Sequence, residues 1–180
     1  MFQKVQILTS VVAGFVAFLV IACPLGAQQT IAVYATDFEA GIDPEWSSVR
    51  LERTPSGRRF LGQFGSQTVR LRLHSLPAHT AGIVSFDLFI IRSWDGYCSR
   101  DGICGPDHWE LQVAGEPEPV LHTTFNNGHP FSINDEQAYP GRFNEESHPA
   151  RTGAAENNSL GFIYGDQRVN PPRAMDAVYQ

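Results

Sequence analysis

The sequence predicts an all-β fold, a jelly-roll β-sandwich of antiparallel strands with little helix. Short segments that alternate between apolar and polar residues recur along the chain, separated by connections rich in glycine and proline. No window of about a dozen residues repeats its apolar positions at helical spacing. Because 180 residues is an ordinary length for one domain, we expect a single β-sandwich domain over residues 28–180.

The first 27 residues are expected to be an export signal. A basic start at Lys4 precedes residues 7–22, ILTSVVAGFVAFLVIA, a run too short for a typical membrane span and suited to a signal peptide. Three outcomes are open: cleavage after Ala27, lipidation of Cys23 in the lipobox-like VIAC with residues 1–22 as a lipoprotein signal, or an uncleaved anchor. Each places the remaining chain in the periplasm, at the cell surface or in the medium of a bacterium, with the signal or a lipid as its only membrane attachment.

The strands are expected in the following order. Residues 30–39, TIAVYATDFE, are rich in β-forming residues, and residues 67–74, QTVRLRLH, alternate with period two, as in a strand that covers a core on one side. Residues 82–94, GIVSFDLFIIRSW, are apolar on both faces and predict a central strand that is buried on both sides. Further strands are expected at residues 108–113, 120–125 and 160–165.

Two segments depart from the strand pattern. Residues 126–159 are polar and have no sustained period, which predicts one long irregular loop, either a functional loop over one face or a mobile insertion. Residues 174–180, AMDAVYQ, begin like a strand and stop. A sandwich cut at that point would expose an open edge, so the domain is expected to lack its closing strands.

Cys98 and Cys104 are expected to form a disulfide. Either processing route removes or caps Cys23 and leaves an even pair with five residues between them. The alternative is half of a zinc site together with His108, although the spacing is longer than is usual for paired zinc ligands. Closing so short a ring would stabilise the fold by about 2 kcal/mol.

The charge of the chain argues against nucleic-acid binding. After removal of Lys4 with the signal, 12 arginines stand against 19 acidic residues, a formal charge of −7. No basic patch with interleaved aromatic residues remains to follow a phosphate backbone.

Four segments, FLGQFGSQTVRLRL, LPAHTAGIVSFDLFIIRSWDG, GPDHWEL and LHTTFNN, together resemble a recurring module of secreted bacterial proteins, some of which carry a PEP-CTERM-type sorting tail. The resemblance covers roughly residues 35–179. It implies a jelly roll of the lectin and carbohydrate-binding-module kind, without an assigned enzymatic activity and with a glycan or cell-surface component as partner. This chain differs by the cysteine pair that follows Trp94, Asp95 and Gly96, and by the missing closing strands and tail.

The sequence offers little for catalysis. Asp107 and Glu110 are at odd spacing for a pair of glycosidase carboxylates, and neither Gly-x-Ser-x-Gly nor His-Glu-x-x-His occurs. His74 and His122 are expected to be solvent-facing strand residues. The favoured function is a non-enzymatic binding module; a carbohydrate-active hydrolase of jelly-roll fold and a purely structural domain of a larger surface protein are the alternatives.

Acidic residues in two places suggest calcium. Asp95, Asp101 and Asp107 recur every six residues through a glycine-rich loop, and Asp37 with Glu39 is a second candidate at the first strand. The competing interpretation is that these side chains cap turns and remain solvated.

Three aromatic residues near the same loop could stack on a sugar ring. Trp94 ends an apolar strand and Trp109 is on the inward face of the next strand, so both also suit a core. Tyr97 is the candidate expected to be exposed.

Overall fold

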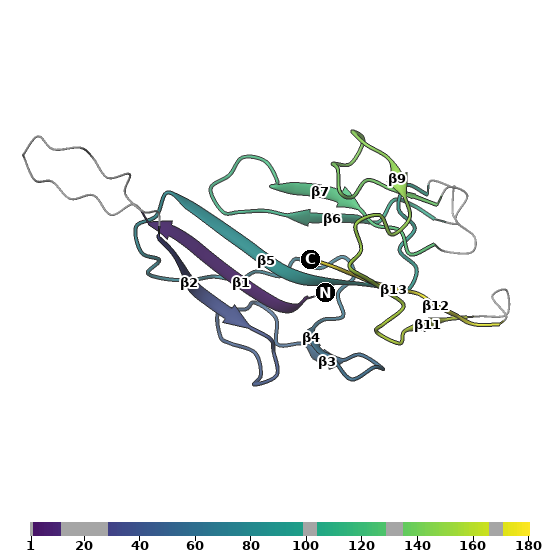
Figure 1. The fold of residues 1–180 in the computed structure, drawn as a ribbon, viewed down its shortest axis with the longest axis horizontal. Helices are drawn as coiled ribbons and strands as arrows, with labels where there is room; N and C mark the ends of the chain where they lie inside the picture. The colour runs from purple at the N-terminus through teal and green to yellow at the C-terminus, as the bar shows by residue number, and fades with distance from the viewer. Residues whose placement is uncertain (1, 12–28, 99–103, 129–134, 166–170) are drawn as a thin grey trace, which may run out of the picture. The chain divides into compact units, whose positions relative to one another are not determined.

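The computed structural model describes residues 2–11, 29–98, 104–128, 135–165 and 171–180, and every regular element within them is a β-strand (Figure 1). The all-β prediction is therefore confirmed. The finer prediction of a jelly roll is not, because the described strands form one seven-stranded sheet and three two-stranded sheets, and none of these sheets closes on itself. Among the described residues, no helix is long and apolar enough to cross a bilayer.

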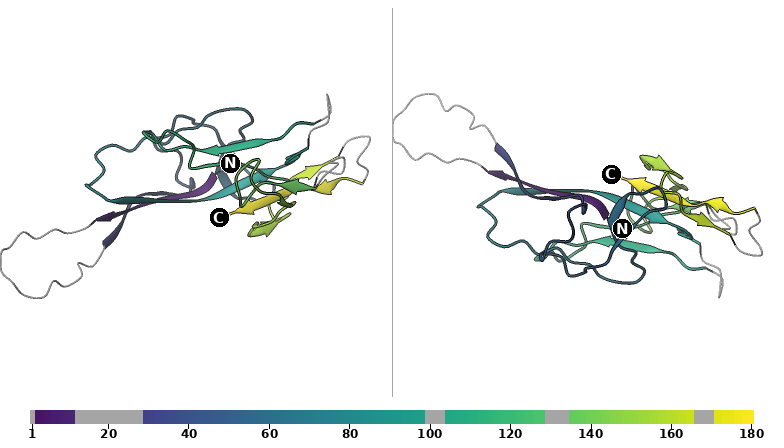
Figure 2. Two further views of the ribbon diagram at one scale, coloured as in Figure 1. Left: turned by 90° about the horizontal axis from the view of Figure 1, so that it is seen from above. Right: turned by 90° about the horizontal axis from the view of Figure 1, so that it is seen from below.

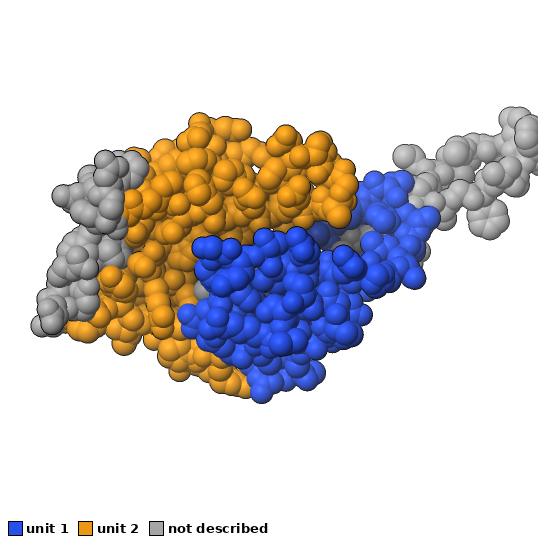
Figure 3. All heavy atoms as spheres, turned by 180° about the vertical axis from the view of Figure 1, so that it is seen from behind, with its two compact units in different colours: residues 1–52, 59–87 blue, residues 53–58, 88–180 orange. Residues whose placement is uncertain are grey.

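The chain divides into two compact units (Figure 3). Unit 1 consists of Met1–Glu52 and Arg59–Asp87, and unit 2 of Arg53–Arg58 and Leu88–Gln180. Strand β5, Ala81–Ile91, contributes residues 81–87 to the first unit and residues 88–91 to the second.

In unit 1, the main pairing joins β1, Phe2–Val11, to β2, Gln29–Thr36, in antiparallel register (Figure 2). A register shift between Ile7 and Leu8 interrupts this pairing. The short strands β3 and β4 are Leu51–Arg53 and Arg59–Leu61. Export and processing of the first 27 residues stay predictions, and Cys23 lies outside the described residues.

The core of unit 1 is built around Phe38, Trp46 and Leu61, all of which are buried. The indole nitrogen of Trp46 donates to the hydroxyl of Tyr34 at 2.8 Å, and that hydroxyl donates to Asp43 at 2.7 Å. Burial, together with the hydrogen bond to Asp43, raises the pKa of Tyr34 to about 12. This hydrogen-bonded chain satisfies polar groups that would otherwise be costly beside an apolar core.

The strand expected at residues 67–74 is not formed. Its apolar face is correctly identified, since Val69 and Leu71 pack against the unit 1 core. The segment meets a neighbour through the single bridge between Leu71 and Trp46, however, and the backbone N–H of Arg70 donates to the side-chain oxygen of Ser47. A side-chain acceptor here takes the place of a ladder carbonyl, so the pairing does not extend.

In unit 2, β6, His108–Leu111, and β7, Leu121–Thr124, form an antiparallel hairpin that confirms two expected strands (Figure 1). The remaining strands are short: β8 Glu136–Gln137, β9 His148–Pro149, β10 Glu156–Asn157, β11 Ile163–Tyr164, β12 Arg173–Ala174 and β13 Asp176–Tyr179. β13 is hydrogen-bonded to β5 on one side and to β10 on the other. Whether further strands follow residue 180 stays a prediction.

Strand β5 is buried on both faces only in its second part. Leu88, Phe89, Ile90 and Ile91 are buried, as the sequence predicts, whereas Val84 is 41% exposed. The register explains the difference, because β13 pairs only with residues 88–91 of this strand.

Residues 126–159 are mostly irregular, as predicted, but the described part is organised around a buried amide. The side-chain oxygen of Gln137 accepts hydrogen bonds from the backbone N–H groups of Asn126 and Arg151, and from the hydroxyl of Tyr179. Its side-chain nitrogen donates to the carbonyls of Tyr139 and Thr152. One glutamine thus supplies the hydrogen bonds that a regular sheet would supply through its backbone.

Candidate functional site

The loop between β5 and β6 begins with a close approach of two backbones in unit 2. Gly96 is buried and has φ +58°, and a β-carbon there would overlap the carbonyl oxygen of Glu136. The next residue, Tyr97, donates its backbone N–H to that same carbonyl at 3.1 Å. Glycine therefore allows the loop to lie directly on β8.

Two links close the loop. Cys98 and Cys104 are joined by a disulfide, which confirms the predicted pairing. Cys98 is buried, and its backbone N–H donates to the carbonyl of Asp95. The backbone N–H of Asp95 in turn donates to the carboxylate of Asp107 at 2.8 Å, so the two ends of the loop are also tied by a hydrogen bond. Both links restrict the position of Tyr97, which precedes the first cysteine.

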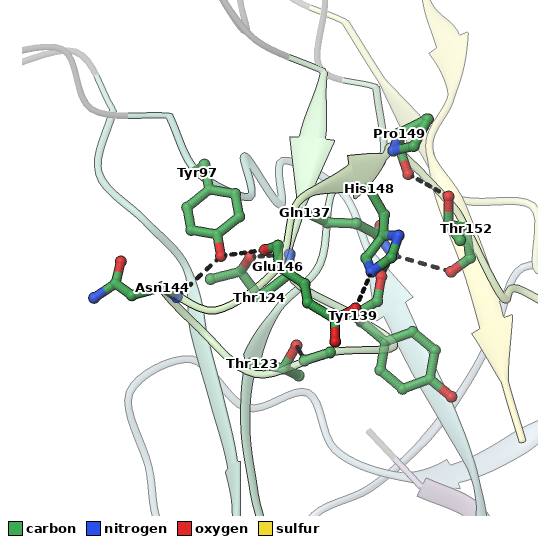
Figure 4. A network of polar contacts seen from close by, with 12 residues as sticks. Tyr97, Thr123, Thr124, Gln137, Tyr139, Asn144, Glu146, His148, Pro149 and Thr152 are labelled. Carbon is green, nitrogen blue, oxygen red and sulfur yellow. Dashed lines mark hydrogen bonds and ion pairs between the residues drawn. The ribbon is translucent and has the colours of Figure 1, made fainter.

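Tyr97 holds the segment that follows Phe143. Its hydroxyl donates to the carbonyl of Glu146 at 2.7 Å and accepts the backbone N–H of Asn144 at 3.0 Å (Figure 4). Its ring stacks on that of Phe143, with centroids 5.4 Å apart. Tyr97 was expected to be the exposed candidate among the three aromatic residues; it is half-buried, and its contacts give it a positioning role.

These contacts border an open depression of about 340 Å³, which we call the Tyr97 depression. Its lining combines one aromatic ring with hydroxyl, amide and carboxylate groups: Tyr97, Glu136, Asn144, Glu145, Glu146 and Ser147. Side chains of this kind can accept and donate hydrogen bonds to the hydroxyl groups of a ligand.

The charge of the Tyr97 depression is negative. Three of the described lining residues are glutamates, and none is an arginine. The nearby Arg142 is directed elsewhere, because its guanidinium donates to the carbonyls of Pro119 and Val120. Glu146 pairs with His148 at 2.9 Å (Figure 4). An anionic ligand would be repelled at this surface.

The two tryptophans predicted as stacking candidates pack in the aromatic core of unit 2. The rings of Trp94 and Trp109 approach Phe125 edge-on, with centroids 6.1 and 6.2 Å away. Phe125 is itself buried against Tyr139 and Tyr179. Burial raises the pKa of Tyr179 to about 12. The structure thus favours the core role for both tryptophans.

Two of the acidic residues predicted for calcium, Asp107 and Asp37, accept hydrogen bonds from the backbone of loop and turn residues. Asp107 accepts the N–H of Asp95, and burial raises the pKa of its carboxyl. Asp37 accepts the backbone N–H of Glu39 at 3.0 Å. Asp101 lies outside the described residues, and within those described no three His, Cys, Asp or Glu side chains are already grouped to hold a metal ion. These contacts favour the turn-capping interpretation.

The zinc alternative for the cysteines is wrong, because both sulfur atoms are consumed in the disulfide. His108 instead contacts His122, with the Nδ1 atom of the first ring 3.0 Å from the Nε2 atom of the second. His122, expected to be a solvent-facing strand residue, lies on β7 with a third of its side chain exposed.

Sequence reasoning missed most of the lining of the Tyr97 depression. Asn144, Glu145, Glu146 and Ser147 belong to the segment expected to be an irregular loop. A signal was present in the string NEES, a polar cluster that directly follows Phe143, but spacing alone cannot show that this cluster meets Tyr97 from 47 residues earlier in the chain.

No protein family, no curated protein and no solved structure matches the chain in sequence or fold comparisons. The resemblance to modules of PEP-CTERM-type sorted proteins therefore stays a prediction, and function is argued from the geometry of the site.

Proposed function

We propose that the protein is a non-enzymatic extracytoplasmic binding module that holds a neutral saccharide in the Tyr97 depression. The observation that carries the proposal is that the Tyr97 depression is open and is lined by one aromatic ring and by carboxylate, amide and hydroxyl side chains. Sugar hydroxyls donate to carboxylates and accept from amides, and the C–H face of a sugar packs on an aromatic ring.

The charge of the lining narrows the class of saccharide. Glu136, Glu145 and Glu146 disfavour uronic acids, sialic acids and sulfated sugars through like-charge repulsion. The disulfide between Cys98 and Cys104 supports a location outside the cytoplasm, where such bonds persist.

A glycan array that contains matched neutral and acidic oligosaccharides tests the proposal. We expect binding to neutral glycans, and we expect Glu145→Gln to weaken it by removing one acceptor. Glu116→Gln is the matched control, because Glu116 lies in the turn between β6 and β7 and does not line the depression.

Other outcomes support the alternatives. Absence of binding to any glycan would favour a purely structural domain of a surface protein. Release of reducing ends from a bound polysaccharide would favour a carbohydrate-active hydrolase, and Glu136→Gln, Glu145→Gln and Glu146→Gln would then identify its carboxylates.

A further inference from the structure

The outer face of the β6–β7 hairpin carries two histidines and a glutamate that point to a metal site. His108 pairs with Thr124 across the hairpin, and Glu110 pairs with His122. Because alternate residues of a strand share a face, His108, Glu110 and His122 all lie on the same side of the hairpin. We propose that these three side chains bind a first-row divalent transition metal ion such as Zn²⁺.

The two ring nitrogens are already close to the separation that a metal requires. His108 Nδ1 and His122 Nε2 are 3.0 Å apart. Zinc–nitrogen bonds of about 2.0–2.1 Å in tetrahedral geometry place two nitrogens about 3.3 Å apart. Opening the contact by a few tenths of an ångström therefore admits the ion between them.

Glu110 supplies the third ligand and the compensating charge. Its Oε1 atom is 3.7 Å from His122 Nε2, and just over half of its side chain is exposed. No three ligands already surround one point in the described part of the chain, so the carboxylate must rotate inward when the ion binds. The remaining coordination position faces solvent and takes water.

Packing against Phe143 holds the rings in place. The ring centroid of His108 is 4.5 Å from that of Phe143 in an edge-on contact, and the ring of His122 is 5.3 Å away. The backbone N–H of Phe143 also donates to the carbonyl of His122 at 2.8 Å. Ordered imidazoles lose less conformational freedom on binding, which favours affinity.

The protons balance without a co-reactant. In the ion-free pair one imidazole nitrogen donates its hydrogen to the other. When the metal binds, that proton moves to the second nitrogen of the same ring, and both facing nitrogens then present lone pairs. Imidazole and carboxylate ligands suit Zn²⁺, Ni²⁺ and Cu²⁺, whereas Mg²⁺ and Ca²⁺ prefer all-oxygen sites.

Calorimetric titration of the untagged, disulfide-intact protein with Zn²⁺ tests the proposal. We expect one saturable site per chain and no corresponding heat with Mg²⁺. His108→Gln and His122→Gln should each weaken affinity at least about tenfold, the loss that even outer partners of metal sites produce. Glu110→Gln should weaken it less. His148→Gln is the control, because that histidine is half-buried beside Glu146 on a different element and should leave affinity unchanged.

A second readout needs no variant. Zn²⁺ should shift the ring ¹⁵N resonances of His108 and His122 in the wild-type protein and leave those of His79 unmoved. The proposal is overturned if wild type shows no saturable Zn²⁺ binding, if the double variant His108→Gln/His122→Gln keeps wild-type affinity, or if the shifted resonances belong to other histidines.

Discussion

Replacing Gly96 by alanine should disrupt the contact between the loop at Gly96 and strand β8, on which the Tyr97 depression depends. Gly96 has φ +58°, in the left-handed region that favours glycine. An added β-carbon would overlap the carbonyl oxygen of Glu136 and lie 3.0 Å from the β-carbon of Asn126. The same carbonyl accepts hydrogen bonds from the backbone of Tyr97 and the side chain of Asn126, so a shift that relieves the overlap breaks both.

The expected decrease in the free energy of unfolding is the sum of these effects. The left-handed conformation costs a residue with a β-carbon about 1–2 kcal/mol. Two weakened hydrogen bonds cost a further 0.5–1.5 kcal/mol each, approximately, in net stability. We therefore expect Gly96→Ala to lower the free energy of unfolding by about 3 kcal/mol. For a protein of this length that corresponds to a decrease in Tm of about 6–12 °C.

Two control variants separate backbone strain from overlap. Gly128 also has a positive φ, +70°, but its β-carbon would meet nothing within 4 Å. Gly105 has open space as well and is not among the residues with positive φ. Thermal unfolding followed by circular dichroism should rank the losses as Gly96→Ala, then Gly128→Ala, then Gly105→Ala near zero. Equal Tm values for the Gly96→Ala and Gly128→Ala proteins would refute the reasoning, since the overlap with Glu136 would then contribute nothing to the loss of stability.

Three further predictions concern stability. Gln137→Leu should lower the free energy of unfolding, measured in urea, by at least about 3 kcal/mol, because it leaves several buried backbone groups without their partner. A decrease below about 1 kcal/mol, the value of one ordinary hydrogen bond, would show that the Gln137 side chain does not organise this segment. The bidentate hydrogen bonds from Arg58 lower the pKa of Glu156. The contribution of this ion pair to the free energy of unfolding is therefore complete above the ordinary glutamate pKa and is lost as pH falls through the lowered pKa. The difference in stability between wild type and Glu156→Gln should shrink in acid, and a difference independent of pH would count against the ion pair. Reduction should increase the intact mass by two hydrogen atoms and lower the unfolding free energy by about 2 kcal/mol; alkylation of Cys98 and Cys104 without reductant would disprove the disulfide.

The strands with tight hydrophobic alternation could be predicted from sequence, and the hairpin of β6 and β7 is an example. Residues 67–74 show the limit of this reasoning. Alternation identifies which side chains face a core, as it does for Val69 and Leu71, but it does not show whether a partner strand offers its carbonyls. The disulfide could be predicted because the expected removal or capping of Cys23 leaves two cysteines and therefore a single pairing.

The candidate site could be predicted from the sequence only in part, for a related reason. Tyr97 was predicted as a site residue, but its partners Asn144 and Glu146 follow in a segment without periodicity. That segment is positioned by the side chain of Gln137 and by the approach of Gly96 to Glu136, and neither contact leaves a repeat in the sequence. Long-range polar contacts of this kind depend on the folded chain.

Chemical-shift mapping with the strongest neutral oligosaccharide from the array tests the central claim most directly. In ¹H–¹⁵N spectra we expect saturable shifts at the backbone amides of Tyr97, Glu136 and residues 144–147, and no such shifts when an acidic oligosaccharide of equal length is added. Saturable shifts that cluster elsewhere, or equal responses to the neutral and acidic sugars, would contradict saccharide binding in the Tyr97 depression.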